Sequence, residues 1–290
     1  MKLGTPEHRD LFCRQFIETH VSFDPERLPW PSLDGETLAL LRAFPFWSYA
    51  ESIEARSARM VELFAHTIDD PLIKEAINVQ AVEEYRHERL MSHVLSFYGV
   101  EAPALPVGEP RATREDFYVF GFGECTDVFI GFGAFSLARE KEIFPSALLG
   151  IFEQLLFEEA RHVVFFTNWW RYEETRAGRD APVRRTIEAL KYHAKAALGT
   201  VGDAPKTPMP KLEGRFAEVF ADVTPVRFLQ AALAENRRVM AKVDPRLLRP
   251  ALMPTLGTLA LAGLSVLPPR AAPPVRDLWK ETFERQTVAA

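Results

Sequence analysis

Residues 83–87 read Glu-Glu-Tyr-Arg-His and residues 158–162 read Glu-Glu-Ala-Arg-His, so the chain contains the pattern Glu-Glu-x-Arg-His twice. Each copy lies in a long segment with helical periodicity. A Glu and a His three residues apart lie on one face of a helix, about one turn apart, so both side chains can bind one metal ion. The repetition therefore predicts a pair of metal-binding helices.

Composition and charge exclude several classes of function. The chain has 290 residues, 47% hydrophobic content and a formal charge of −5, so nucleic acid is not expected as a partner. Cys13 and Cys125 are too few for a thiolate metal site or a disulfide framework.

Residues 1–10 lack the apolar core of a signal peptide, which favours a cytoplasmic location. Membrane association is not expected, because the uncharged segment 251–268 is short and interrupted by Pro and Gly.

The chain is predicted to be all-α, because strand signals are scarce and helical periodicity dominates its middle. Asp70 with Pro71 has the form of a helix start, and Thr113 with Asp116 has the spacing of a capping box. The long helices are expected at residues 44–68, 71–98, 113–142 and 145–174.

The connection 99–112 is rich in Pro and Gly and must be non-helical. A helix of ~25 residues is roughly 38 Å long, and fourteen extended residues reach about 45 Å, so this connection can cross the length of a bundle. Two helical hairpins joined by one long crossover form the pattern of a ferritin-like four-helix bundle.

The predicted domain organisation places this four-helix core at residues 43–175. Residues 1–42 are interpreted as a less regular N-terminal cover, and residues 176–290 as an accessory helical layer. In that layer, helices are expected at residues 183–198, 216–243 and 246–266, with a loop at residues 199–210.

The Glu and His of each pattern lie on a helical stripe that is otherwise apolar. A carboxylate is almost never buried unless it is paired or bound to a metal. A single Glu-x-x-His favours a solvated surface pair, but its recurrence on the same stripe favours a dinuclear metal site. The first ligands predicted are Glu84, His87, Glu159 and His162.

The first helix of each hairpin should supply one more carboxylate at the same level along the bundle as the Glu-x-x-His pair. In the second hairpin Glu124 precedes Glu159 by 35 residues, and Asp127, one turn further on, is the alternative.

In the first hairpin the choice lies between Glu54 and Glu51, which precede Glu84 by 30 and 33 residues. Glu54 is preferred because it points about 140° away from Arg59, which should face water. Matching the two hairpins at their prolines would favour Glu51 instead.

Four carboxylates and two imidazoles suit iron or manganese better than a metal that prefers thiolates. Two iron ions are the first choice, and a mixed iron and manganese site is the variant. Open coordination positions would let dioxygen act as co-substrate.

The doubled pattern over residues 44–174 resembles the ferritin-like diiron-carboxylate superfamily. Its full form, Glu-Glu-x-Arg-His, is similar to the oxygenase branch, which includes soluble acyl-ACP desaturases and the hydroxylases of bacterial multicomponent monooxygenases. The resemblance implies an outer hydrogen-bond shell that orients the imidazoles, formed by Glu83, Arg86, Glu158 and Arg161. The alternative for these residues is solvated surface charge.

The expected function is that of a non-haem diiron oxygenase or oxidase acting on a small or medium, apolar organic molecule. An external electron donor such as a ferredoxin is expected, because the chain has no flavin or dinucleotide motif, and the protein could form a homodimer. One alternative is a ferroxidase or peroxide-reducing protein. The other is a structural helical protein whose acids pair with Arg86 and Arg161.

Glycines within the helix expected at residues 113–142 leave a further question open. Glycine costs helix stability, so several of them need a reason. They indicate either a substrate cavity beside Glu124 or close helix packing, and they are Gly121, Gly123, Gly131 and Gly133.

Overall fold

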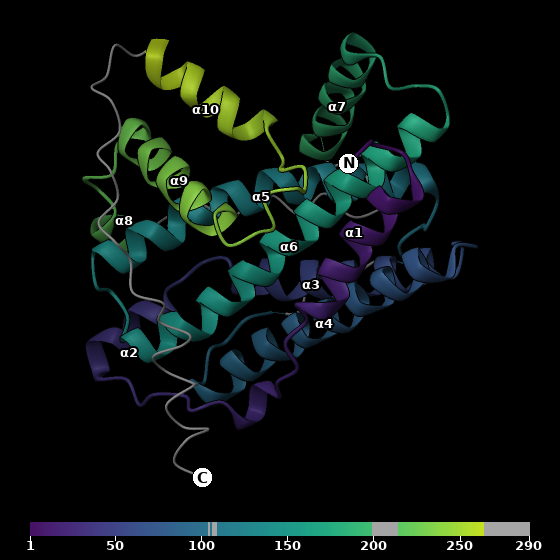
Figure 1. Ribbon diagram of the computed structural model, residues 1–290. Coiled ribbons are helices and arrows are strands. Elements are labelled where there is room, and N and C mark those ends of the chain that lie inside the picture. The colour runs from purple at the N-terminus through teal and green to yellow at the C-terminus, as the bar shows by residue number, and fades with distance from the viewer. Residues whose placement is uncertain (104, 106–108, 199–213, 264–290) are drawn as a thin grey trace.

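The computed structural model describes residues 1–103, 105, 109–198 and 214–263 (Figure 1). Over these ranges the regular structure is helical and contains no strand, which confirms the all-α prediction. Four long helices form the centre of the molecule. They are α3 (Trp47–Ala65), α4 (Pro71–Phe97), α5 (Arg114–Glu140) and α6 (Ser146–Arg176).

The ends of these helices follow local capping chemistry. The Asp70 carboxylate accepts hydrogen bonds from the backbone N–H groups of Leu72 and Ile73, which have no partner within the helix. Thr113 and Asp116 form the predicted capping box at the start of α5. All four central helices lie within a few residues of the predicted bounds.

Each central helix packs against two others: α3 and α6 both contact α4 and α5. Tyr85 donates a hydrogen bond to Glu62 and Ser92 donates one to Glu51, so α3 and α4 run in opposite directions.

The contacts of α6 give the remaining directions. Arg161 binds Glu83 of α4, whereas Glu158, earlier in α6, binds Arg86, so α4 and α6 are antiparallel. The ring of Phe117 packs edge-on to Trp169, and Gly131 faces Leu156, so α5 and α6 are antiparallel too. Consequently α4 and α5 run in the same direction, and the connection between them has its two ends at opposite ends of the bundle.

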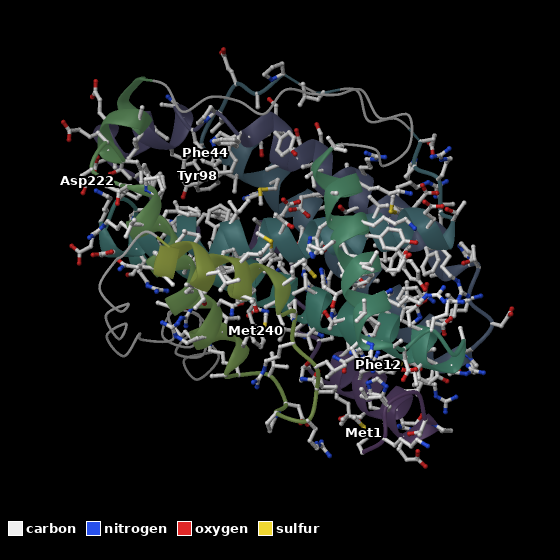
Figure 2. All side chains as sticks on the ribbon, turned by 90° about the horizontal axis from the view of Figure 1, so that it is seen from above. Met1, Phe12, Phe44, Tyr98, Asp222 and Met240 are labelled. Carbon is white, nitrogen blue, oxygen red and sulfur yellow. The ribbon has the colours of Figure 1, made fainter. Side chains whose placement is uncertain are left out.

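Two apolar clusters fill the bundle around the buried polar residues of α4 and α6. The larger cluster includes Phe12 and the stacked rings of Phe64 and Phe117. The smaller cluster includes Tyr98, with Phe44 packed against it. Figure 2 labels Phe12, Phe44 and Tyr98 and shows the first well separated from the other two. These polar residues, the buried polar belt of the bundle, are therefore surrounded by extensive apolar packing.

The N-terminal cover is more regular than the sequence suggests. It contains α1 (Pro6–Glu18), a 3₁₀ turn (Pro25–Arg27) and α2 (Gly35–Arg42). Helix α1 packs against both α4 and α6, the two helices that carry the repeated pattern. Its position makes the N-terminal segment part of the wall around the polar belt.

The C-terminal part adds α7 (Pro182–Ala197) and α9 (Pro225–Met240), which both pack on α5, and α10 (Leu252–Gly263), which packs mainly on α9 (Figure 1). The prediction of one helix over residues 216–243 is wrong, because the segment divides into α8 (Gly214–Val219) and α9. The break arises at Thr224 and Pro225, where the threonine side chain caps a new helix and the proline begins it.

The predicted helix at residues 246–266 begins only at Leu252, and its residues 264–266 lie outside the described ranges, as does the predicted loop 199–210. None of the helices in the described ranges is both long and apolar enough to cross a membrane.

Two of the α5 glycines are explained by close packing. A Cβ atom on Gly121 would lie 2.3 Å from the ring of Phe166, and one on Gly133 would lie 2.7 Å from the ring of Phe228. Side chains at these positions would collide with aromatic rings of α6 and α9. Gly123, by contrast, would place its Cβ 3.3 Å from the methyl group of Ala196 in α7.

Candidate metal centre

The structure brings together all six residues that the sequence predicts as metal ligands. They form two groups. Within each group, every residue offers one possible ligand atom, and these atoms all lie within 4.8 Å of one another. One group contains Glu54, Glu84, His87 and Glu159, and the other contains Glu84, Glu124 and His162. All four central helices contribute, so the centre exists only in the assembled bundle.

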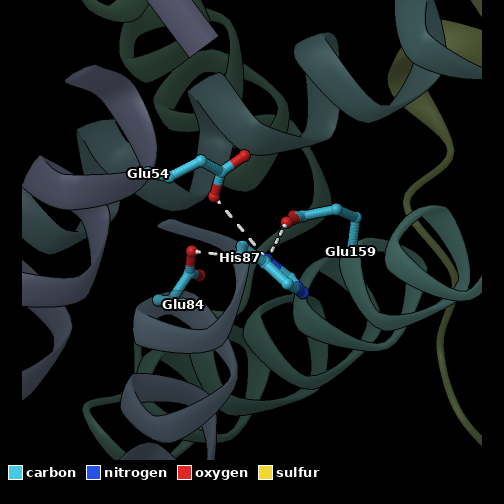
Figure 3. A group of neighbouring side chains, drawn as sticks. All are labelled: Glu54, Glu84, His87 and Glu159. Carbon is cyan, nitrogen blue, oxygen red and sulfur yellow. Dashed lines mark ion pairs between the residues drawn. The ribbon is translucent and has the colours of Figure 1, made fainter. Parts of the chain in front are cut away.

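Around His87, three carboxylates approach the same ring nitrogen (Figure 3). Its Nδ1 lies 2.9 Å from Glu159, 3.6 Å from Glu54 and 4.0 Å from Glu84. Around His162, the Nδ1 atom lies 3.1 Å from Glu84 and 3.5 Å from Glu159.

Glu84 and Glu159 occupy the middle of the centre. Glu159 presents Oε1 to His87 and Oε2 to His162, whereas Glu84 presents Oε2 to His87 and Oε1 to His162. Each carboxylate therefore faces both imidazoles with separate oxygens, which is the arrangement required of a group that bridges two ions.

The alternatives that the sequence left open lie outside both groups. Glu51 accepts a hydrogen bond from Ser92 at the surface, at 2.7 Å, and Asp127 is exposed to solvent. The structure thus brings Glu54 and Glu124 into the centre rather than these two carboxylates.

A reciprocal set of contacts holds the far side of each imidazole. His87 Nε2 lies 2.9 Å from Glu158, which also accepts a hydrogen bond from Arg86 at 2.7 Å. His162 Nε2 lies 2.9 Å from Glu83, which accepts one from Arg161 at 2.7 Å. All of these acids and arginines are buried, so they are not solvated surface charge. Each acid serves the histidine of the other helix, which the sequence pattern does not reveal.

The N-terminal segment completes one side of this outer hydrogen-bond shell. Arg161 donates to Thr19 Oγ1 at 2.9 Å and to the carbonyl oxygen of Phe16, at the end of α1. His20 Nδ1 lies 2.6 Å from Glu83. Sequence reasoning missed these residues because they lie at or just beyond the end of a separate helix and carry no ligand spacing.

The ring contacts assign the proton of each imidazole to Nε2, because that nitrogen faces a carboxylate. The two Nδ1 atoms and Glu84 Oε2 are then buried with no hydrogen-bond partner. Unsatisfied buried polar atoms are rare and need an explanation. A metal ion between them would satisfy these acceptors, so the residues present fit such a group.

The electrostatics of the centre reflect its crowded negative charge. Burial raises the pKa of Glu54 to about 7 and that of Glu124 well above its usual value. Burial alone would lower the pKa of His87, but the carboxylates of Glu158, Glu159 and Glu54 together outweigh that effect and raise it. These shifts show that the cluster as a whole favours added positive charge.

Comparison with known proteins found no match for this chain among family models, curated proteins or solved structures. A function for the centre must therefore be inferred from its own residues and their geometry.

Proposed function

We propose that the six residues bind two iron ions and that the protein is a diiron oxygenase or oxidase built on a ferritin-like bundle. The observation that carries this proposal is the position of Glu84 and Glu159, each of which offers one oxygen to the surroundings of each histidine. A single ion would leave half of these oxygens and one imidazole without a partner.

Charge balance supports two divalent ions. The arginines 86 and 161 already neutralise Glu158 and Glu83 through close ion pairs. Four further carboxylates remain in the two groups, namely Glu54, Glu84, Glu124 and Glu159. Burying that many negative charges without compensation is prohibitively costly, and two divalent ions would offset them.

The donor set favours iron or manganese over zinc or copper sites that rely on sulfur. Carboxylate oxygens and imidazoles suit these metals, and neither cysteine belongs to the two groups. Two bound iron ions would supply the electrons that reduce dioxygen. Glu83 and Glu158 would hold the imidazole rings in position, while the surrounding apolar clusters would restrict water.

The bundle topology is consistent with a ferritin-like fold. Helices α4 and α5 run in the same direction and are joined by a connection whose ends lie at opposite ends of the bundle. This is the single-crossover arrangement of such bundles, in which inward Glu and Glu-x-x-His side chains form the metal site.

The proposed reaction needs an organic substrate and an external electron donor, since the chain has no motif for a flavin or dinucleotide. A reducing, cytoplasmic environment fits the two cysteines, which are buried and form no disulfide.

The non-enzymatic alternative is disfavoured by the ion pairs. Arg86 and Arg161 bind Glu158 and Glu83, so they do not account for the burial of Glu84 or of the histidines. A purely structural role would leave the Nδ1 atoms unsatisfied.

Metal analysis tests the proposal directly. Protein produced in iron-rich medium should contain about two iron ions per chain, and Glu159→Ala should lose most of both. Glu51→Ala, which removes a surface carboxylate from the same bundle, is the matched control and should retain them. Less than one metal per chain in the unmodified protein, or full iron content in Glu159→Ala, would refute the ligand set.

Oxygen uptake separates the enzyme from a ferroxidase. After chemical reduction, an oxygenase or oxidase should consume dioxygen in an amount limited by its own bound iron. Repeated oxidation of added ferrous iron, with release of ferric product, would identify iron as the substrate instead.

A further inference from the structure

Helix α7 is attached to the molecule through one of its faces. On this face the buried ring of Tyr192 stacks on Phe122 and meets Tyr118 edge-on, and both partners belong to α5. One turn later, the methyl group of Ala196 approaches Gly123 of the same helix. Within the described ranges, the contacts of α7 with other helices concentrate on α5. The opposite face of α7 therefore points away from the bundle.

This outward face is apolar. Its large side chains are 46% to 73% exposed, and they lie with Ala194 within an arc of about 80° around the helix axis. They are Val183, Ile187, Leu190 and Leu198, the last of which ends the helix. No charged residue of α7 falls inside that arc. An exposed apolar stripe of this length on a surface helix indicates an interaction site.

Basic side chains border one edge of the apolar arc. Lys191 and Arg184 follow it at about 20° and 40° around the helix axis, and both are exposed. The acids beside the basic edge are Glu188, 3.0 Å from Lys191, and Glu115 of α5, which pairs with Lys195. An exposed ion pair contributes little free energy, so the pairing of Lys191 with Glu188 is readily exchanged. With four basic residues and one acid, α7 has a formal charge of +3, whereas the whole chain has −5. The local charge stays positive when Glu115 is included.

An apolar face bordered by basic residues, on a helix of low overall hydrophobicity, is typical of helices that lie in the plane of a membrane surface. The apolar face enters the boundary between headgroups and acyl chains, and the cations meet anionic headgroups. A second copy of the chain is a poorer match, because a symmetric pair would bring two positive helices together. The charge of α7 therefore favours an anionic lipid surface.

Helix α10 adds apolar surface on the same side of the bundle. Figure 1 shows α7 and α10 on the upper side of α5, and both helices contact it. Leu256 and Leu259 of α10 are exposed, and residues 252–263 include no charged side chain. Apolar surface suited to a lipid boundary is therefore not confined to α7.

We propose that α7 binds the surface of a membrane that contains anionic lipids, with its apolar arc below the headgroups and with Arg184 and Lys191 beside the lipid phosphates. The expectation against membrane association concerned a span, whereas α7 would lie on the surface without crossing it. The inference goes beyond the proposed function and does not depend on iron. Because Ala196 packs on Gly123, which precedes Glu124, the contact would bring the candidate metal centre close to the membrane.

The test measures binding of the full-length protein to sedimenting vesicles. One set contains phosphatidylcholine alone, and the other contains phosphatidylcholine with an equal amount of phosphatidylglycerol. The partition coefficient should be at least about ten-fold larger on the anionic vesicles, because several cations contribute. Added salt should reduce this preference, since it screens charges at a surface.

Three variants make the test specific to α7. Ile187→Ser combined with Leu190→Ser should lower binding to the anionic vesicles by at least about ten-fold, because it removes apolar area from the arc. Arg184→Gln should lower it by about five-fold and leave binding to neutral vesicles unchanged. Phe97→Ser is the matched control, since it removes a half-exposed apolar side chain at the end of α4, and it should bind as the unmodified protein does. All of these positions are exposed, and circular dichroism checks that each variant is folded.

Three results would overturn the proposal. These are equal binding to the two kinds of vesicle, binding that survives loss of Ile187 and Leu190, and a dimer in solution that the same double variant converts to a monomer. The last result would assign the apolar arc to a second copy of the chain. Iron content measured on the same samples tests the proposed function separately. A chain with little iron that still selects anionic vesicles through α7 would refute the diiron centre and retain the membrane contact.

Discussion

The two halves of the centre share one sequence pattern but are closed by different parts of the molecule. On the His162 side, Glu83 is surrounded by Arg161 and His20, and the end of α1 lies against them. On the His87 side, Glu158 receives hydrogen bonds from Arg86 and from Gln154 of its own helix. A repeated pattern thus fixes the inward side chains, whereas the surrounding segments decide how firmly each half is held.

The two arginines show the difference most clearly. Arg161 donates to Glu83, to Thr19 and to the backbone of Phe16, and its guanidinium lies 4.5 Å from the centre of the Phe16 ring. Arg86 makes its hydrogen bond to Glu158 and lies 4.3 Å from the centre of the Phe23 ring. Of these two arginines, Arg161 alone therefore forms hydrogen bonds to α1 and to the residue that caps its end.

The largest expected effect comes from removing these arginines. Arg86→Ala and Arg161→Ala should each lower the free energy of unfolding by about 3–5 kcal/mol, because each leaves a buried carboxylate without its cation. Arg161→Ala should cost more, since it also breaks the contacts to α1. Urea unfolding at neutral pH measures both values, and an equal or larger loss in Arg86→Ala would contradict the proposed asymmetry.

A smaller effect is expected from neutralising the acids that orient the histidines. Glu83→Gln and Glu158→Gln should each weaken metal binding by about 10- to 100-fold, because a neutral amide is a weaker acceptor for the imidazole N–H than the carboxylate and fixes the tautomer less firmly. Glu83→Gln should weaken the ion beside His162, and Glu158→Gln the ion beside His87. Stepwise titration with a spectroscopic metal such as cobalt(II) resolves the two affinities. Equal weakening of both ions by either variant would show that the halves do not act separately.

The smallest expected effect concerns the two residues that distinguish the halves. His20→Ala and Gln154→Ala each remove one polar partner of a buried acid and should cost about 1 kcal/mol of unfolding free energy. His20→Ala should also increase hydrogen exchange in α1, whereas Gln154→Ala should not, because Gln154 lies within α6. Unchanged exchange in α1 would mean that its other contacts, among them the hydrogen bonds of His8 with Asn168 and of Arg161 with Thr19, hold this helix in place without His20.

Some of these features could be predicted from the sequence, and others appear only in the tertiary structure. The Glu-x-x-His pairs, the helix starts at Pro71 and Thr113, and the all-α class follow from spacing and capping, which act over a few residues. The choice of Glu54 over Glu51 could also be reached from sequence, because helical geometry relates it to a neighbouring arginine.

The C-terminal part shows where such reasoning stops. The periodicity of residues 216–243 continues through Thr224 and Pro225, although these residues are also a capping residue and a helix start. Thr224 and Pro225 are local signals that periodicity alone overlooks, because a capping threonine followed by proline begins a new helix.

The sequence by itself determined that two helices carry inward Glu and His pairs and that two further carboxylates should join them. Only the tertiary structure decided that Glu83 and Glu158 serve the histidine of the opposite helix, that α1 closes one half through Thr19 and His20, and that α7 keeps an apolar face exposed. The physical reason is the distance along the chain over which each effect acts. Helical periodicity orients side chains about one axis, whereas contacts between helices depend on how the whole bundle packs.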